Sequence, residues 1–254
     1  MAIHTHPRRR VYGIRKIHAH LNKHRALRGE PAVARCTIER LCRQLGVRGV
    51  VRGKYPRTTK PAPETGRPLD LVNRDFTVPA PDRLWVADLT YVKTASGWVY
   101  VAFVLDVFSR MIVGWQASTR MYTDLALDAL RMGLHRRGQQ GSDLRDLKHH
   151  SDRGVQYRAI RYAETLEQAG AVASVGSKGD SYDNAMAEAL NSLYKAELIH
   201  LDGPWEGHHD VERATAEWVH WFNTDRVHSM LDYRSPSEVE DAYYAGVRDT
   251  ALAA

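Results

Sequence analysis

Three runs rich in β-branched and aromatic residues follow one another at residues 85–93, 97–106 and 111–117, with only short turns between them. Residues of this kind favour extended backbone, and turns as short as these join neighbouring strands that run antiparallel. The stretch after residue 84 is therefore predicted to open with three antiparallel strands.

After residue 120 the pattern changes to an alternation of helices and strands. Apolar residues at helical spacing alternate with short apolar runs that are bounded by turn residues. This alternation predicts, in chain order, a helix at 123–137, a strand at 147–151, a helix at 160–169, a strand at 171–175 and a helix from 184 onward. The order is typical of an α/β, ribonuclease H-like fold, in which helices flank a mixed five-stranded sheet.

Three acidic residues occupy positions in these elements from which they could share a site. Asp88 lies inside the first predicted strand, Asp152 ends the fourth, and Glu188 lies on the helix predicted from residue 184, away from its apolar stripe. Each acid by itself also fits an ordinary role, as an edge-strand charge, a turn former or a solvated helix residue. The residue types alone leave both interpretations open.

The sequences around the three acids resemble those of a known family. They read W-x-x-D-x-T-Y at Asp88, H-S-D-x-G-x-Q-Y at Asp152 and D-N-A-x-A-E at Glu188, and 35 residues separate the second acid from the third. These motifs resemble the catalytic core of DDE insertion-sequence transposases. The chain is most similar to the second-frame (OrfB-type) proteins of the IS-three family, which have a retroviral-integrase-like core.

The resemblance implies metal-dependent cleavage and strand transfer of DNA at the ends of an insertion sequence. Two divalent ions, Mg²⁺ or Mn²⁺, serve such phosphoryl transfer, and carboxylate oxygens suit them as ligands. Asp88 is implied to bridge both ions, with Asp152 on one and Glu188 on the other. The implied partners are element ends, target DNA, further copies of the chain, and an upstream-frame DNA-binding protein, either separate or fused.

Other residues near the acids carry two interpretations each. Lys195 lies about two helical turns beyond Glu188 and is a candidate phosphate contact, with a solvated surface lysine as the alternative. His150 and Gln156 are candidates for supporting the acids or the substrate, with packing and helix capping as the alternatives. Asp106 ends a predicted strand before a turn, where aspartate commonly makes local hydrogen bonds.

The charge of the chain is strongly asymmetric. Residues 1–60 contain 16 Lys and Arg against two acids, so the remaining residues contain 20 basic and 28 acidic groups. An excess of this size is typical of a module that binds a polyanion, and nucleic acid is the favoured partner. No apolar run approaches the roughly 20 residues that span a bilayer, so we expect no membrane contact and a cytoplasmic, nucleoid-associated protein.

The basic region contains two predicted helices. The first covers residues 11–24, and the second is capped by Thr37 and has Ile38, Leu41 and Leu45 as its apolar stripe. A Gly-Pro turn between them favours a helix-turn-helix, and a basic hairpin that only packs is the alternative. Only eleven residues precede Tyr12, which predicts a truncated chain or the back half of a frameshift fusion. The candidate DNA contacts are Arg15, Lys16, Arg35, Arg40, Arg43, Arg48, Arg52 and Lys54.

The predicted organisation is a basic DNA-binding segment at 1–55, a linker at 56–80 and a catalytic core at 81–245 that includes a C-terminal helical signature. Two other functions stay open. The chain could be a catalytically idle DNA-binding protein derived from a transposase, or a ribonuclease H-like nuclease. The intact set of acids argues against the first, and the fused basic segment argues against the second.

Overall fold

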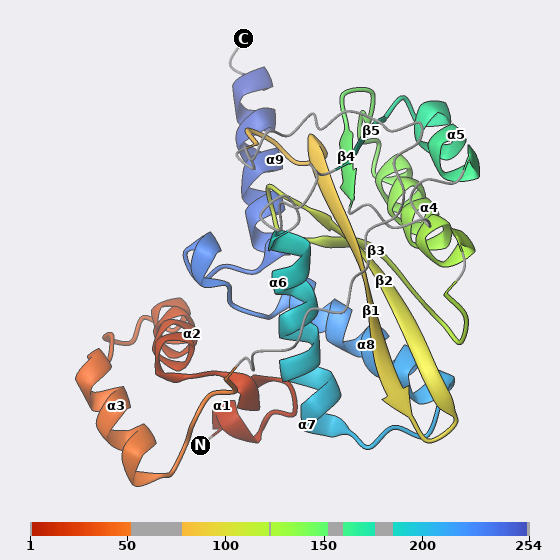
Figure 1. Ribbon diagram of the computed structural model, residues 1–254. Helices are drawn as coiled ribbons and strands as arrows, with labels where there is room; N and C mark the ends of the chain where they lie inside the picture. Colours follow the sequence, from red (N-terminus) through yellow and green to blue (C-terminus); the bar gives the residue numbers. More distant parts are fainter. Residues whose placement is uncertain (1, 52–77, 122, 152–159, 176–184, 253–254) are drawn as a thin grey trace. The chain divides into compact units, whose positions relative to one another are not determined.

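A computed structural model of the chain describes residues 2–51, 78–121, 123–151, 160–175 and 185–252 (Figure 1). Its contacts divide the chain into two compact units, Lys54–Glu217 and the combination of Met1–Gly53 with Trp218–Ala254. None of the helices in the described ranges is both long enough and apolar enough to cross a lipid bilayer.

The sheet of the larger unit has five strands in the spatial order β3-β2-β1-β4-β5. β2 pairs antiparallel with both β1 and β3, whereas β4 pairs parallel with β1 and β5. The predicted mixed five-stranded sheet with flanking helices is thus confirmed. Its strands are β1 Leu84–Thr94, β2 Gly97–Asp106, β3 Ile112–Ser118, β4 Lys148–Ser151 and β5 Val172–Val175.

β1 and β2 form a long hairpin whose far end extends beyond the pairing of the other strands. The hairpin closes where Thr94 pairs with Gly97, and Gly97 has a φ of 122°, a conformation that glycine adopts without strain. β4 pairs only with residues 84–87 of β1. Among the described residues, the rest of that edge of β1 therefore has no strand partner.

One face of the sheet is covered by α4 Thr123–Gln139 and α5 Ile160–Gln168 (Figure 1). Trp85 and Ala87, alternate residues of β1, are buried in this core together with Leu127 and Leu130 of α4. Residues two apart on a strand share a face, so Val86 and Asp88 belong to the opposite face. One face of β1 thus packs in this core, and the opposite face carries Asp88 toward the site.

A buried polar network ties the start of β1 to the end of α4. The Arg137 guanidinium lies 2.8 Å from the Asp82 carboxylate, which also accepts a hydrogen bond from the Trp85 indole at 3.1 Å. Asp106 accepts hydrogen bonds from the backbone amides of Asp82 and Ser109, and burial raises the pKa of Asp106 to about 6. Asp106 therefore fixes the turn after β2 and the residues that precede β1, as its position before a turn indicated.

The opposite face of the sheet carries the helical segment that follows residue 184. α6 Ala185–Tyr194 packs against β1 and β2, and the Tyr194 ring meets Phe103 edge-on with centroids 5.0 Å apart. The segment continues through a π-helical turn, η3 Lys195–Ile199, into α7 His200–Asp202. The predicted helix is therefore present, but its last turn is wider than an α-helical one.

The smaller unit combines the two ends of the described chain. Tyr12 links them, because its hydroxyl accepts a hydrogen bond from the Val227 amide at 3.0 Å and its ring lies 6.0 Å from that of Trp221. The sequence-based domain limits at residues 55, 80 and 245 stay predictions. The elements of this unit are α1 Ala2–Thr5, η1 Arg9–Val11, α2 Ile14–Leu27, α3 Arg35–Gln44, the end of α8 His208–Thr224, η4 Ser229–Leu231 and α9 Pro236–Leu252.

α3 differs from its prediction at both its start and its buried face. It begins at Arg35, with Ala34 at the N-cap and no side-chain cap, and the Thr37 amide donates to the Ala34 carbonyl within the first turn. The predicted cap at Thr37 was therefore wrong. Ile38 is buried as expected, but the two leucines of the predicted stripe are exposed, and Cys42, four residues after Ile38, is buried instead. The packing against the rest of the unit, rather than the local pattern, selects the buried face.

Gly114 of β3 allows the close approach of α4. A Cβ at this position would lie 2.0 Å from the carbonyl oxygen of Ala129 and 2.8 Å from the amide nitrogen of Gly133. We expect Gly114→Ala to lower the free energy of unfolding by about 1–3 kcal/mol, because the strand or helix must move. Urea denaturation measures the change.

Gly138, on the exposed side of α4, is the matched control, since a Cβ there meets nothing within 4 Å. Gly138→Ala is expected to raise the free energy of unfolding by about 0.5–1 kcal/mol, because alanine favours a helix. Equal stabilities of the two variants would contradict the close contact of strand and helix.

Candidate active site

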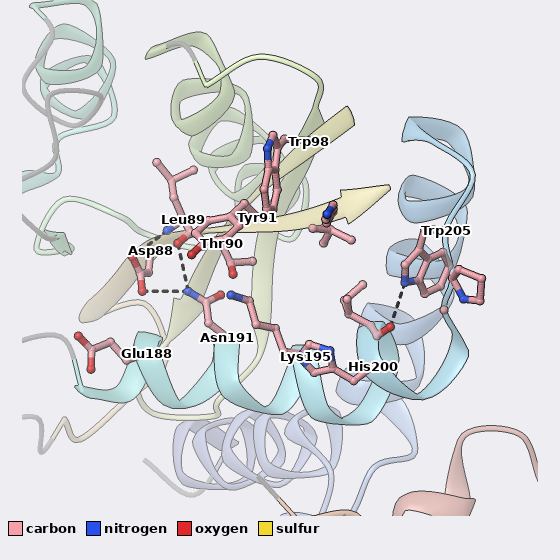
Figure 2. Close-up of a pocket in the computed structure, with 15 residues that line it drawn as sticks. Asp88, Leu89, Thr90, Tyr91, Trp98, Glu188, Asn191, Lys195, His200 and Trp205 are labelled. Carbon is pink, nitrogen blue, oxygen red and sulfur yellow. Dashed lines mark hydrogen bonds between the residues drawn. The ribbon is translucent and has the colours of Figure 1, made fainter. Parts of the chain in front are cut away.

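A groove of about 540 Å³ lies beside β1, between that strand and the segment formed by α6, η3 and α7 (Figure 2). Six consecutive residues of β1, 88–93, line it, as expected for the strand edge that β4 leaves open. Further lining comes from the start of β2 and from residues 203–205. The polar and aromatic residues of the lining are Asp88, Thr90, Tyr91, Lys93, Trp98, Glu188, Asn191, Lys195, His200 and Trp205.

Asp88 is the first residue of β1 beyond the pairing with β4, and two hydrogen bonds orient its half-buried carboxylate. Oδ1 accepts from the Leu89 amide at 2.8 Å, and Oδ2 accepts from Nδ2 of Asn191 at 2.9 Å (Figure 2). Each carboxylate oxygen can accept more than one bond, so both oxygens retain capacity toward a ligand. The arrangement presents a pre-oriented carboxylate to the groove.

Glu188 and Lys195 reach the same groove from the helical segment. Glu188 is an exposed residue of α6, and Lys195 is the first residue of η3, with its Nζ 4.5 Å from the centroid of the Tyr91 ring. Figure 2 shows Glu188, Asn191 and Lys195 on the side of the helix that faces β1. The structure therefore brings Asp88, Glu188 and Lys195 together.

Asn191 is a site residue that the sequence interpretation missed. Its side chain is buried, its Nδ2 binds Asp88, and its Oδ1 is buried without a hydrogen-bond partner among the described residues. The available signal was its spacing, three residues after Glu188 and four before Lys195, which puts all three on one helical face. An amide oxygen buried in this position adds a possible ligand to the carboxylates.

Asp152 and Gln156 lie outside the described residues, but the strand that leads to Asp152 is described. β4 ends at Ser151, and Ser151 pairs with Ala87, the residue before Asp88. In the sequence Asp152 follows Ser151 directly. The two strands that lead to these aspartates are therefore neighbours and run in the same direction.

The two histidines before Ser151 are both buried and face opposite sides of the sheet. His149 accepts or donates a hydrogen bond with the Tyr162 hydroxyl at 3.1 Å, and burial lowers the pKa of His149 to about 3. His150 lies on the face of Val86 and Asp88, and its Nδ1 is 3.0 Å from the Ser174 hydroxyl. The His150 side chain thus links β4 to β5 inside the protein and does not line the groove.

The basic candidates of the smaller unit are arranged on its helices. Arg15 on α2 and Arg48 after α3 are exposed, and Lys16 lies with its Nζ 5.3 Å from the centroid of the Tyr12 ring. Arg35, Arg40 and Arg43 are exposed along α3. Arg52 and Lys54 lie outside the described residues.

Comparison with protein families identifies the parts of the chain. Residues 78–181 match an integrase core domain, residues 170–236 match a second integrase core model, and residues 2–55 match an HTH-like domain. A protein chain from a simian T-cell lymphotropic virus intasome has the same fold, with a TM-score of 0.52 at 14% identity over 90% of this chain and 74% of that one. Fold and groove thus define an integrase-type catalytic core.

Relatives of known designation narrow the assignment. The chain is 51% identical to a transposase described for IS986/IS6110 of Mycobacterium tuberculosis, covering 92% of this chain and 83% of the relative. It is 48% identical to the transposase of IS629 from Shigella sonnei, covering 96% and 79%. It is 33% identical to the transposase InsF of IS3A from Escherichia coli, covering 81% and 70%.

The chain therefore belongs to the DDE transposases of insertion sequences, in the IS-three family. It functions in DNA transposition as a polynucleotidyl transferase. Integrase-core enzymes generally use a divalent metal, and the donors that line the groove, carboxylate and amide oxygens, are those that hard cations prefer.

Asn191→Leu tests the role of the amide that holds Asp88. Leucine has a similar size, so we expect the fold to persist while the Asp88 carboxylate loses its orienting donor. Removing such a supporting hydrogen bond weakens metal affinity by about 10–100-fold, so the Mg²⁺ concentration for half-maximal DNA cleavage should rise by this factor. Thermal unfolding is measured in parallel.

Ser192→Ala is the matched control on the next residue of α6, because among the described residues the Ser192 hydroxyl donates to the Glu188 carbonyl within the helix, at 3.0 Å, and not to Asp88. Its Mg²⁺ dependence should equal that of the parent. A similar rise in both variants would assign the effect to the helix rather than to the bond with Asp88.

Proposed function

We propose that Asp88, Asp152 and Glu188 are the catalytic acids of this transposase and hold two divalent ions, Mg²⁺ or Mn²⁺. With them the chain cleaves DNA at the ends of its insertion sequence and joins those ends to target DNA. The observation that carries this proposal is that Asp88 on β1 and Glu188 on α6, one hundred positions apart in the sequence, line one groove.

The donor set of the groove fits such ions. The Asp88 carboxylate is already oriented by Leu89 and Asn191, and Glu188 is exposed in the same groove. The buried Oδ1 of Asn191 is an oxygen donor that the described residues leave without a hydrogen bond. When bound, two such ions activate a water or a 3′-hydroxyl for in-line attack and stabilise the leaving oxygen.

The acids differ in how firmly the protein holds them. Asp88 projects from a strand paired on both sides up to residue 87, and Asn191 holds its carboxylate, so its position is set before DNA binds. Glu188 lies on an exposed helical surface and can adjust its side chain to the substrate. Asp152 follows Ser151, and the parallel pairing of Ser151 with Ala87 supports a location for Asp152 near Asp88.

Lys195 is proposed to contact a DNA phosphate. Its ammonium already lies over the Tyr91 ring, and an ammonium has three N–H donors, so a phosphate oxygen can bind beside the ring. A cation at this position also offsets the charge of the acids and of the DNA backbone.

The smaller unit is proposed to bind the element ends through phosphate contacts. Residues 2–55 match the HTH-like domain, and exposed arginines of this region lie along α2, α3 and the segment after α3. Because transposition acts on two ends, we propose at least two copies of the chain in the DNA complex, with an upstream-frame DNA-binding protein as a further partner or fusion.

Neutralising the three proposed catalytic acids should abolish DNA cleavage and joining but preserve DNA binding. Glu188→Gln, Asp88→Asn and Asp152→Asn keep the side-chain volumes but remove the charge, and a neutral amide is a weaker ligand for Mg²⁺ than a carboxylate. We expect cleavage and joining to fall by at least about 100-fold on a labelled DNA that carries an end of the insertion sequence, whereas retention of this DNA in gel shifts persists.

Glu167→Gln is the matched control, because Glu167 is an exposed acid of α5 outside the groove. Glu197, nearer to Glu188 in the sequence, is unsuitable because its side chain is buried. Undiminished joining by folded Glu188→Gln protein would overturn the proposal. Parent protein that cleaves without joining would be a nuclease, and one that only retains DNA would be an idle binding protein.

The salt dependence of DNA binding tests the role of α3. Replacing Arg35, Arg40 and Arg43 together by Gln should reduce the slope of log affinity against log salt by roughly 0.9 for each phosphate that the variant no longer neutralises. Fluorescence anisotropy with duplex DNA between 50 and 200 mM salt, roughly the range over which such slopes are measured, gives the value.

A second triple variant, with Arg131, Arg145 and Arg213 replaced by Gln, removes the same charge from exposed positions of the larger unit. Its slope should change less than that of the α3 variant. Equal slopes for the two variants would mean that net charge, rather than binding of phosphates by α3, controls DNA affinity.

A further inference from the structure

Two large aromatic side chains are exposed at the far end of the β1–β2 hairpin, beside the candidate acids. Tyr91 is 38% exposed and Trp98 is 49% exposed, and their rings meet edge to face with centroids 5.3 Å apart. Both line the groove that contains Asp88 and Glu188 (Figure 2). Aromatic rings of this size usually contribute to a core, so a pair of them on a groove wall indicates a ligand.

The charges around this aromatic pair narrow the chemistry of the ligand. Lys195 lies over the Tyr91 ring, and Lys93 lines the same groove. Ring faces bind the flat surfaces of nucleobases, and ammonium groups bind the phosphates between them. An aromatic pair with a lysine at 4.5 Å thus matches a nucleotide better than an apolar peptide or a lipid.

The shape of the groove favours an unpaired nucleotide over a base pair. Its volume of about 540 Å³ is within the range of roughly 300–1,000 Å³ that is typical of pockets for small ligands. In a duplex both faces of a base are covered by its neighbours. A protein ring can therefore stack on a base only after that base has left the duplex.

We propose that Tyr91 and Trp98 form a stacking site for an unpaired nucleobase at the end of the DNA substrate, with Lys195 on the adjacent phosphate. The inference rests on the proposed function, because it places this base next to the phosphate that the acids act on. Stacking on the hairpin holds the strands apart at the DNA end and gives the scissile phosphate access to Asp88 and Glu188.

The test compares single-stranded and duplex DNA in full-length protein. The probes are a fluorescein-labelled dodecathymidylate and a fully paired duplex of the same length with blunt ends, measured by anisotropy in EDTA. We expect Tyr91→Ala and Trp98→Ala each to weaken binding of the single strand about tenfold, within the range found for removal of one stacking ring. Binding of the duplex should change less than about twofold, because its bases are not available for stacking.

Conservative and remote variants separate stacking from structural damage. Tyr91→Phe and Trp98→Phe keep a ring and should restore most of the single-strand affinity. Tyr244→Ala is the matched control, because Tyr244 is 39% exposed on α9 and forms a similar edge-to-face pair with Tyr243, with centroids 5.4 Å apart. It should leave single-strand affinity unchanged.

Two outcomes would overturn the inference: unchanged single-strand affinity in both alanine variants, or equal losses on the two probes. Equal losses together with a smaller oligomer of Trp98→Ala in sedimentation would make this face an interface between copies of the chain. Because the assay contains no divalent ion, its result is independent of the catalytic acids. If Glu188→Gln stays active while Tyr91→Ala loses affinity for single-stranded DNA, the proposed catalytic role of the acids is wrong and the stacking site is retained.

Discussion

The short parallel pairing between β1 and β4 is the constraint on which the candidate site depends. It joins only residues 84–87 of β1 to β4, so Ser151 lies beside Ala87. In the sequence, an aspartate follows each of these two residues. Because the pairing with β4 stops here, the rest of that edge of β1 has no strand partner among the described residues, and the groove lies beside it. A longer β4 would place a strand where the groove lies, and a shift in register would separate the ends that precede the two aspartates.

The helix beside this edge supplies orientation as well as charge. The spacing of Glu188, Asn191 and Lys195 puts an acid, an amide and a cation on one side of α6 and η3. The bond from Asn191 to Asp88 joins helix to strand, and a buried amide without it would carry the cost of an unsatisfied polar group. The same bond therefore stabilises the packing of α6 and fixes the carboxylate that faces the groove.

The sequence predicted those features that depend on local pattern or on extended motifs. The strand runs predicted the sheet, and the resemblance of the motifs around the acids to those of DDE transposases implied that Asp88 and Glu188 would share a site. The hydrogen bond between Asn191 and Asp88 could not be predicted, because it depends on how α6 lies along β1. The prediction of a cap at Thr37 failed because α3 begins two residues earlier, at Arg35, so that Thr37 lies inside its first turn. The joining of Tyr12 to Val227 likewise depends on contacts between distant parts of the chain.

The central claim is that the groove beside β1 is a metal-dependent catalytic centre. Anomalous scattering from crystals of the full chain soaked in Mn²⁺ tests it most directly, because it locates the ion without reference to activity. The account predicts Mn²⁺ within coordination distance of the Asp88 and Glu188 carboxylates, roughly 2.0–2.2 Å, the range for hard cations of this size. Strong peaks only at the surface group of His208, His209 and Glu212, with none in the groove, would contradict it.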